Sequence, residues 1–340
     1  MTQAAQLAQY GANNVGLSFK NRIINGDMVI NQRGFSGVVP DSSSTYTLDR
    51  WELLETGSMA FSAQQSTTVP SGAGFTNSIL ITTTTAASPA SGSRSQFQQY
   101  IEGFNVADLG WGTASASSVT LSFWVRSSLT GQFGGSLANS ANSRSYPFAY
   151  TISAANTFEY KTITIPGDTT GTWLTTNGRG IALHFDLGMG SSLLGTAGAW
   201  AASDFRGATG DVKLSETSGA TFFLTGVQLE KGTVATSFDY LPYGTELILC
   251  QRYFELVSAR FGGAAQSSAA ASGTGIFVVE KRATPTITWI SSTASLNFPT
   301  TAPAGYSPVI NTRYFTPFKI ANGTSYDSRF DDLYSASAEL

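Results

Sequence analysis

The sequence predicts an all-β protein: two antiparallel β-sandwich (jelly-roll-like) domains preceded by a short N-terminal anchoring segment. Three observations predict this. Charged residues make up only 12% of the chain, about half the usual share in soluble proteins. Serine, threonine, asparagine and glutamine supply the polarity, with 35 glycines, which suits pleated surfaces and tight turns better than long solvated helices. Several short segments also carry apolar residues at every second position.

The alternation of apolar and polar residues is clearest in two segments. SSVTLSFWVRSS places Val119, Leu121, Phe123 and Val125 on one face of a strand, and IALHFDLG repeats the pattern from Ile181. NSILITTTT, FEYKTITIPGDT and TFFLTGVQLEKG predict three more strands, the last two ended by glycine-bearing turns. Short strands separated by turns favour a sandwich of antiparallel sheets. A parallel sheet would need amphipathic crossover helices, which the sequence does not suggest.

A length of 340 residues exceeds the usual span of one hydrophobic core, which favours two domains. Pro242, Tyr243 and Gly244 interrupt the pattern, so we predict a first domain over 21–245 and a smaller one over 246–340. In the second, RYFELVSARF, GTGIFVVEK, TPTITWISS, TRYFTPFKI and LYSASAEL predict strands, and the low-complexity stretch GGAAQSSAAASGTG predicts a long flexible loop. For residues 1–20 we predict a weakly helical segment. It is either a frayed tail or an anchor that attaches the chain to a partner.

Charge and cysteine content exclude several classes of protein. The net charge is −3, and without a basic patch we expect no nucleic acid partner. Cys250 is the single cysteine, so stability must come from packing or from association between chains. No run of about 18 apolar residues predicts membrane insertion, and the N-terminus does not resemble a signal peptide. We therefore expect synthesis in a cytoplasm.

Few residues have the chemistry that catalysis requires. His184 is the only histidine. A zinc site built on two histidines is therefore excluded, and any catalytic triad with a histidine base would depend on this one residue. We expect His184 to face solvent or to form a polar pair across the strands. The acids are scattered beside turns, which disfavours paired-carboxylate hydrolysis. Asp331 and Asp332 are adjacent and should point to opposite faces of a strand rather than bind calcium together. We expect no enzyme activity, no cofactor and no metal.

Aromatic residues, at 12% of the chain, are more informative. Tyr146, Trp111, Trp173 and Trp200 lie in glycine- or alanine-rich segments typical of loops. An exposed ring can stack on the C–H face of a sugar, so these four are the candidate glycan-binding residues. Packing in loops or at a subunit interface is the alternative for each of them. For the strand aromatics Phe123, Trp124, Phe222 and Phe223, core packing is expected.

Four blocks carry a resemblance to a family: NRIINGDMVINQRG, YTLDRW, SVTLSFWVRS and TFFLTGVQLEKGTVATSFDYLPYGTELILCQRYF. They resemble a module of tailed-bacteriophage virion proteins, often labelled tail fibre, and they span most of 21–254 in that family's order. The final SASAEL also looks like the ending of such chains; residues 255–340 otherwise match mainly in pattern.

The first domain is also similar to carbohydrate-binding modules with a jelly-roll fold, through Asn25-Gly26-Asp27 and Ser122-Phe123-Trp124. Many such modules hold a structural calcium ion, but here Leu224-Thr225-Gly226 stands where they have closing aspartates, so none is expected. We predict that Asn21 to Gly34 forms a first strand and corner, with Asp27 or Asp49 fixing turns and Trp51 packed beneath.

The resemblance implies a virion structural protein assembled in the host cytoplasm. It implies a homotrimeric tail fibre or appendage that contacts other virion proteins through residues 1–20 and host surface polysaccharide through distal loops, including 262–275. A capsid decoration or head-fibre protein without receptor binding is the alternative. A polysaccharide depolymerase is less expected, because the repeats of a long β-helix are missing.

Overall fold

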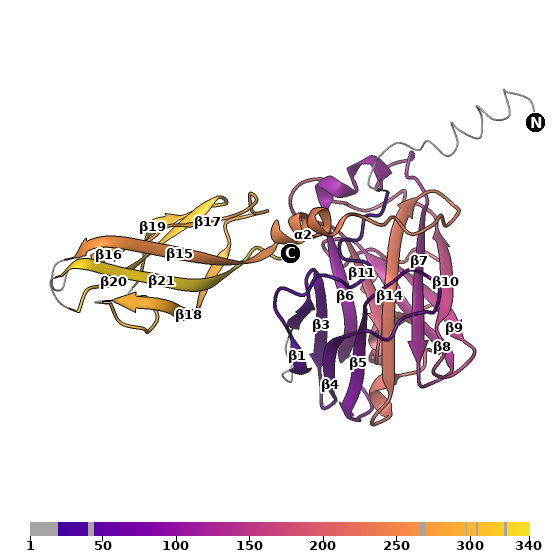
Figure 1. Ribbon diagram of the computed structural model, residues 1–340. Coiled ribbons are helices and arrows are strands. Elements are labelled where there is room, and N and C mark those ends of the chain that lie inside the picture. Colours follow the sequence, from indigo (N-terminus) through magenta and orange to yellow (C-terminus); the bar gives the residue numbers. More distant parts are fainter. Residues whose placement is uncertain (1–19, 40–43, 266–269, 297, 304, 323–324) are drawn as a thin grey trace, which may run out of the picture.

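The computed structural model describes residues 20–39, 44–265, 270–296, 298–303, 305–322 and 325–340. Two β-sandwich domains lie on either side of helix α2 (Tyr243–Gln251), and the second domain extends away from the first (Figure 1). The predicted all-β, antiparallel sandwich class is confirmed. The predicted attachment segment 1–20 lies outside the described residues except for Lys20. No helix among the described residues is long and apolar enough to cross a membrane.

The first domain consists of two six-stranded antiparallel sheets. The first sheet has the order β1-β4-β5-β14-β7-β10, with strands Ser36–Val38, Ala60–Ser66, Ser78–Thr85, Thr221–Lys231, Val119–Ser127 and Glu159–Ile165. The second has the order β2-β3-β6-β11-β8-β9, with strands Ser44–Leu48, Trp51–Thr56, Arg94–Glu102, Arg179–Asp186, Gly131–Ala138 and Ser145–Ile152. Connecting segments add η1 (Gly103–Asn105), η2 (Ala107–Leu109), η3 (Ser191–Leu193), η4 (Leu214–Glu216) and the short parallel pair β12 (Leu194–Gly195) and β13 (Gly207–Ala208).

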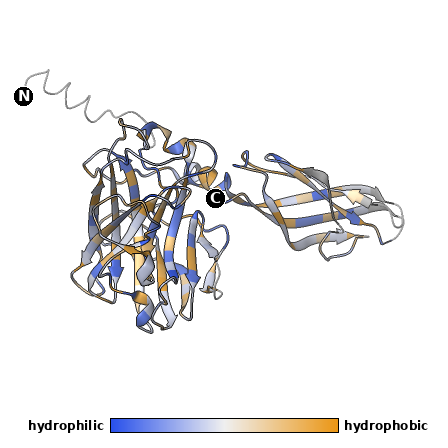
Figure 2. Cartoon of the chain, turned by 180° about the vertical axis from the view of Figure 1, so that it is seen from behind, coloured by the Kyte–Doolittle hydropathy of each residue, from blue (hydrophilic) through white to orange (hydrophobic). Residues whose placement is uncertain are grey.

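The core lies between these sheets and follows the period-two pattern. All five strands predicted in this domain are present as β5, β7, β10, β11 and β14. The apolar residues of β7 and β11 are buried in one continuous cluster, in which Trp51 stacks on Phe97 at 4.9 Å between ring centroids. Hydrophobic and hydrophilic residues interleave along the strands (Figure 2), because successive side chains point to opposite faces of a sheet.

The opening segment Asn21 to Gly34 forms turns and bends, so the predicted first strand is wrong. Asn25 explains the difference, since it adopts φ +57° and its side chain replaces strand pairing: Nδ2 donates to the carbonyls of Ile30 and Asp49, and Oδ1 accepts from Ile30 N–H. Asp49 fixes a turn as expected, accepting from the backbone N–H of Gln32 at 2.7 Å. Trp51 is fully buried and donates to the Asn25 carbonyl. The stretch is therefore a corner held by side chains.

Helix α2 (Tyr243–Gln251) follows Pro242, and the predicted boundary between 245 and 246 falls inside it. The sequence indicated only a short apolar segment here. The helix docks on the opening corner, where Cys250 and Tyr253 pack against Ile24 and Ile30. The carboxylate of Glu246 accepts a hydrogen bond from the Asn25 N–H.

The second domain is a smaller sandwich. One sheet has the order β15-β21-β18 (Phe254–Ala265, Ser325–Ser337 and Thr286–Leu296). The other pairs β20 (Tyr314–Ile320) with β16 (Ala270–Ser272), β17 (Gly275–Ile276) and β19 (Gly305–Ile310). The strand predicted in GTGIFVVEK is thus reduced to two residues. The loop predicted over 262–275 is wrong in part, because β15 continues to Ala265 and β16 starts at Ala270; residues 266–269 lie outside the described residues.

Asp331 and Asp332 face opposite sides of β21, as predicted. Asp332 points inward to the ammonium of Lys319 at 2.8 Å, with both side chains 0% exposed. Asp331 points outward to Arg260. The adjacent carboxylates therefore belong to two separate ion pairs.

Candidate functional site

The four predicted glycan-binding aromatics converge on one cluster, although they are far apart in the sequence. Trp111 contacts Trp173 at 4.7 Å and Trp200 at 5.3 Å between ring centroids. Trp173 and Trp200 are 5.4 Å apart, and Tyr146 meets Trp200 at 5.3 Å. All four contacts are edge-to-face, the arrangement that aromatic quadrupoles favour. Three of these residues lie outside regular strands, but Tyr146 belongs to β9, so its assignment to a loop is wrong.

The indole N–H groups of the three tryptophans form hydrogen bonds within the domain. The indole N–H groups of Trp111, Trp173 and Trp200 donate to backbone carbonyls of Ser117, Thr170 and Pro166. Trp111 and Tyr146 are only 8% and 5% exposed, and burial raises the pKa of the Tyr146 phenol. A cavity of about 200 Å³ beside Trp111 and Trp173 remains. Glycan binding by this cluster stays a prediction, since its rings are largely occupied with one another.

A buried ion pair supports the loops that carry the cluster. Arg144 binds both carboxylate oxygens of Asp168 at 2.7 Å. Burial opposes ionisation of Asp168, but hydrogen bonds from Arg144 and Thr170 outweigh it and hold the pKa of Asp168 below its usual value. The pair therefore fixes the segment that leads to Trp173.

A second aromatic surface lies on the outer face of the first sheet, and the sequence reasoning missed it. Trp124 of β7 and Tyr160 of β10 are cross-strand partners whose rings are 5.3 Å apart. Core packing was expected for Trp124, but only Phe123 and Phe222 lie in the core. Trp124 is half-buried on the opposite face, and Phe223, also outward, packs against Phe158. The alternation in β7 already separated Phe123 from Trp124 and could have located this surface.

His184 lies on the outer face of the second sheet but does not face solvent. It is fully buried, and its Nδ1 pairs across the strands with the Ser136 hydroxyl at 2.9 Å, which is one of the two arrangements expected for it. Its Nε2 meets Arg206 at 3.1 Å. Burial, reinforced by the charge of Arg206, lowers the pKa of His184 well below its usual value. The imidazole is neutral and closed to a substrate, so it is no general base for an external molecule.

Several buried acids have raised pKa values, Asp49 and Glu52 among them, a feature that often marks active sites. Burial raises the pKa of Asp186 to about 8, that of Glu246 to about 7 and that of Asp211 to about 6. Each accepts backbone N–H groups that shape a turn; Asp186, for example, accepts from Gly188 and Met189. Their exposed fractions are 2%, 8% and 8%, and Glu246 also lines a small cavity with Asp27 and Asp239. In the part of the chain that the structure describes, no three acid, histidine or cysteine side chains group as a metal site.

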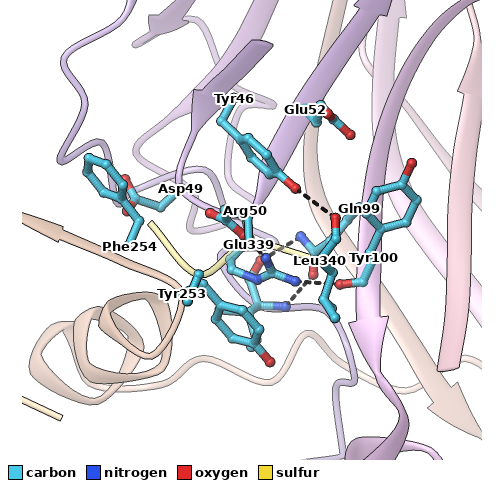
Figure 3. Close-up of polar contacts among 12 residues, drawn as sticks. Tyr46, Asp49, Arg50, Glu52, Gln99, Tyr100, Tyr253, Phe254, Glu339 and Leu340 are labelled. Carbon is cyan, nitrogen blue, oxygen red and sulfur yellow. Dashed lines mark hydrogen bonds and ion pairs between the residues drawn. The ribbon is translucent and has the colours of Figure 1, made fainter. Parts of the chain in front are cut away.

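A cluster of charged side chains lies at the joint between the domains. Glu339, next to the end of β21, binds the guanidinium groups of Arg50 and Arg33 from the first domain. The Arg50 guanidinium also lies 3.6 Å above the Tyr253 ring. Figure 3 shows this arrangement, with Tyr46 directed at Leu340. Because Arg50 is 1% exposed and Glu339 about 6%, the contacts between the two domains are shielded from water.

A second ion pair reinforces the joint. Arg252 binds Glu102 through two hydrogen bonds of 2.7 and 3.0 Å, and the Tyr253 hydroxyl donates to the same carboxylate. Burial opposes ionisation of Glu102, but the hydrogen bonds from Arg252 and Tyr253 outweigh it and lower the pKa of Glu102. Together with the docked α2, these contacts connect the two domains.

No family model and no curated protein sequence matches the chain. Among solved structures, the enzymatically active domain of tailspike protein 4 of bacteriophage CBA120 is similar at 14% identity and TM-score 0.35, covering 63% of this chain and 22% of that one. This chain therefore spans about a fifth of the tailspike chain.

A family 11 carbohydrate-binding module of Clostridium thermocellum, in complex with a mixed-linked tetrasaccharide, is similar at 12% identity and TM-score 0.29, covering 59% and 98% of the two chains. Discoidin II of Dictyostelium discoideum reaches 11% identity and TM-score 0.21, over 82% and 81%. Similarities this low assign no function, and the sandwich architecture stands on the strand order of the chain itself.

Proposed function

We propose that the chain is a non-enzymatic structural protein of a tailed-bacteriophage virion, a homotrimeric tail fibre or appendage that attaches to glycans of the host surface. The observation that carries the proposal is the joint, in which the buried Arg50–Glu339 pair and the partly exposed Arg252–Glu102 pair connect two β-sandwiches in one elongated body. Such a body suits a load-bearing appendage. Enzymes that close domains around a substrate instead need a hinge.

Two further observations support the proposal. The acids with raised pKa values and His184 are enclosed, which fits a protein without catalysis. The sequence blocks that resemble phage virion proteins form the opening corner, β7, β14 and α2, the elements that build the first domain and the joint.

The proposed trimer has a candidate contact face on the second domain. Ile276 and Val278 are 71% and 68% exposed, and Ile276 pairs across the strands with the exposed Tyr314. Ile320, on the same outward face of β20, is 46% exposed. Exposed aliphatic residues gathered on one sheet face are typical of surfaces that another chain covers.

We expect light scattering of the purified chain at micromolar concentration to give three times the mass of 35.8 kDa. Changing Ile276 and Val278 together to serine should shift the protein towards monomers, because it removes apolar area that association buries. As a control, serine at Val234, which is 72% exposed in the first domain, should leave the mass unchanged. A wild-type monomer would remove the trimer from the proposal.

Attachment is tested with fluorescently labelled protein on host cells and on their extracted polysaccharide. Saturable binding without release of reducing sugars is the expected result. Release of sugars would identify a depolymerase instead. Capsid labelling in virion images without affinity for host cells would identify a decoration protein.

A further inference from the structure

The outer face of the first sheet holds a groove of about 450 Å³, within the range of ligand pockets. We call it the aromatic groove. Its floor is Ser122 and Gly226, one wall is the Trp124–Tyr160 pair, and the other wall is formed by Phe75, Phe238 and Tyr240 with Ala73 and residues 235–237. Neither the sequence motifs nor the comparisons point to this face.

The second wall is preformed. Phe75, Phe238 and Tyr240 contact one another with ring centroids 4.9 to 5.5 Å apart. The Tyr240 hydroxyl donates to the Ala73 carbonyl at 2.7 Å. Phe75 packs on Gly226, which has φ +62° and no room for a Cβ, since that atom would lie 2.5 Å from the Phe75 ring. Glycine at this β-bulge therefore lets the ring sit directly on the sheet.

The segment 236–239, which carries this wall, is tied to β14. The Glu230 carboxylate accepts from the backbone N–H and the hydroxyl of Thr236. Gln228 accepts from the Asp239 N–H at 2.9 Å. Because these bonds hold the segment in place, little ordering entropy would oppose binding.

In the first wall, the indole N–H of Trp124 differs from those of the other tryptophans in the first domain, which form hydrogen bonds. The indole N–H groups of Trp51, Trp111, Trp173 and Trp200 all donate to backbone carbonyls. Trp124 is half-buried and Tyr160 is 44% exposed, so their rings present polar edges and apolar faces to the groove. A free indole N–H beside an exposed ring can both stack on a ligand and donate to it.

The side chains that line the groove carry no charge. Besides the five aromatic rings, they supply hydroxyl groups from Ser122 and Ser237, whereas the Thr236 hydroxyl is already bonded to Glu230 and Lys20. Flat apolar faces together with uncharged donors and acceptors match a neutral sugar, which has a C–H face and peripheral hydroxyls. The lining side chains offer an anionic sugar or a charged peptide no counter-charge for its lost hydration. Lys20 adjoins the groove, but its ammonium is already bonded to the Thr236 hydroxyl and the Ser237 carbonyl.

We propose that the aromatic groove binds a neutral saccharide, with one sugar ring stacked on Tyr160 and Trp124 and its hydroxyls bonded to Trp124 Nε1–H and the Ser122 hydroxyl. The proposal deepens the proposed function and rests on it, by naming the surface and the ligand class. It also assigns the Trp111–Trp173–Trp200 cluster to packing and not to sugar contact.

The test uses the full chain on an array of neutral glucose, mannose and galactose polysaccharides, with polyuronates as the charged comparison. Affinity for the best-bound neutral polysaccharide is then measured by titrating the intrinsic fluorescence. We expect Tyr160→Ala and Trp124→Ala each to weaken binding about tenfold or more, which corresponds to about 1.4 kcal/mol. Tyr243→Ala, which removes an aromatic ring 63% exposed on α2, is the matched control and should bind as the wild type does.

Tyr160→Ala alters an exposed side chain, so its fold can be verified by an unchanged melting temperature. Neutral-glycan binding that survives both groove variants but is lost in Trp173→Ala would overturn the groove while leaving the proposed function intact. Preference for polyuronates over neutral polymers would also overturn it. Absence of binding to all polymers and to host cells would remove the proposed attachment function as well.

Discussion

Replacing Arg50 by methionine will lower the free energy of unfolding by about 3–5 kcal/mol, the usual effect of removing one partner of a buried ion pair. The change leaves the Glu339 carboxylate, about 6% exposed, with Arg33 as its remaining cation. It also removes the stacking on Tyr253 and the hydrogen bond to the Tyr100 carbonyl. Urea unfolding monitored by tryptophan fluorescence measures the loss.

The matched control is Arg313→Met, which breaks the ion pair with Glu280, whose side chains are 75% and 53% exposed. Exposed pairs contribute at most about 1 kcal/mol. The double change Arg50→Met with Glu339→Met should recover part of the loss, since no buried carboxylate then lacks its partner. A loss in Arg50→Met no larger than in Arg313→Met would show that the joint is not desolvated in solution.

The joint also separates what could be predicted from the sequence from what could not. Period-two alternation and turn signals predicted five of the first domain's strands, and alternation placed Asp331 and Asp332 on opposite faces, because side-chain direction in a strand depends only on local position. Arg50 and Glu339 are 289 residues apart in the sequence. Nothing local marks them as partners, since the pairing follows from where β21 ends relative to β3.

The candidate site also has features that could be predicted from the sequence and features that could not. Residue type and local context selected Trp111, Trp173 and Trp200 one at a time, and the structure brings them together through edge-to-face contacts. The aromatic groove combines β7, β10 and β14 with segments near Phe75 and Phe238. Its Trp124–Tyr160 pair depends on strand register, which a single sequence specifies only after the sheet order is known.

The free energy of unfolding will fall by about 3 kcal/mol between pH 6.5 and pH 8.5, and about 2 kcal/mol of that fall will be absent in Asp186→Asn. Burial raises the pKa of Asp186 to about 8 and that of Glu246 to about 7, whereas both groups titrate near pH 4 when unfolded. The folded chain therefore binds more protons than the unfolded chain in this interval, so raising the pH favours unfolding. Urea unfolding at a series of pH values measures the slope.

At lower pH, other titrating groups oppose this dependence of stability on pH. Burial holds the pKa of His184 well below 6.5, so unfolding takes up a proton there and stability is lost as pH falls below about 6.5. Asparagine at position 186 keeps the oxygen that accepts from Gly188 and Met189 and places an amide where the protonated acid has its hydroxyl. Asp108→Asn, at a side chain 47% exposed, should leave the slope unchanged. Equal slopes in the wild type and Asp186→Asn would mean that Asp186 is ionised in the folded protein, and burial would then not control its charge.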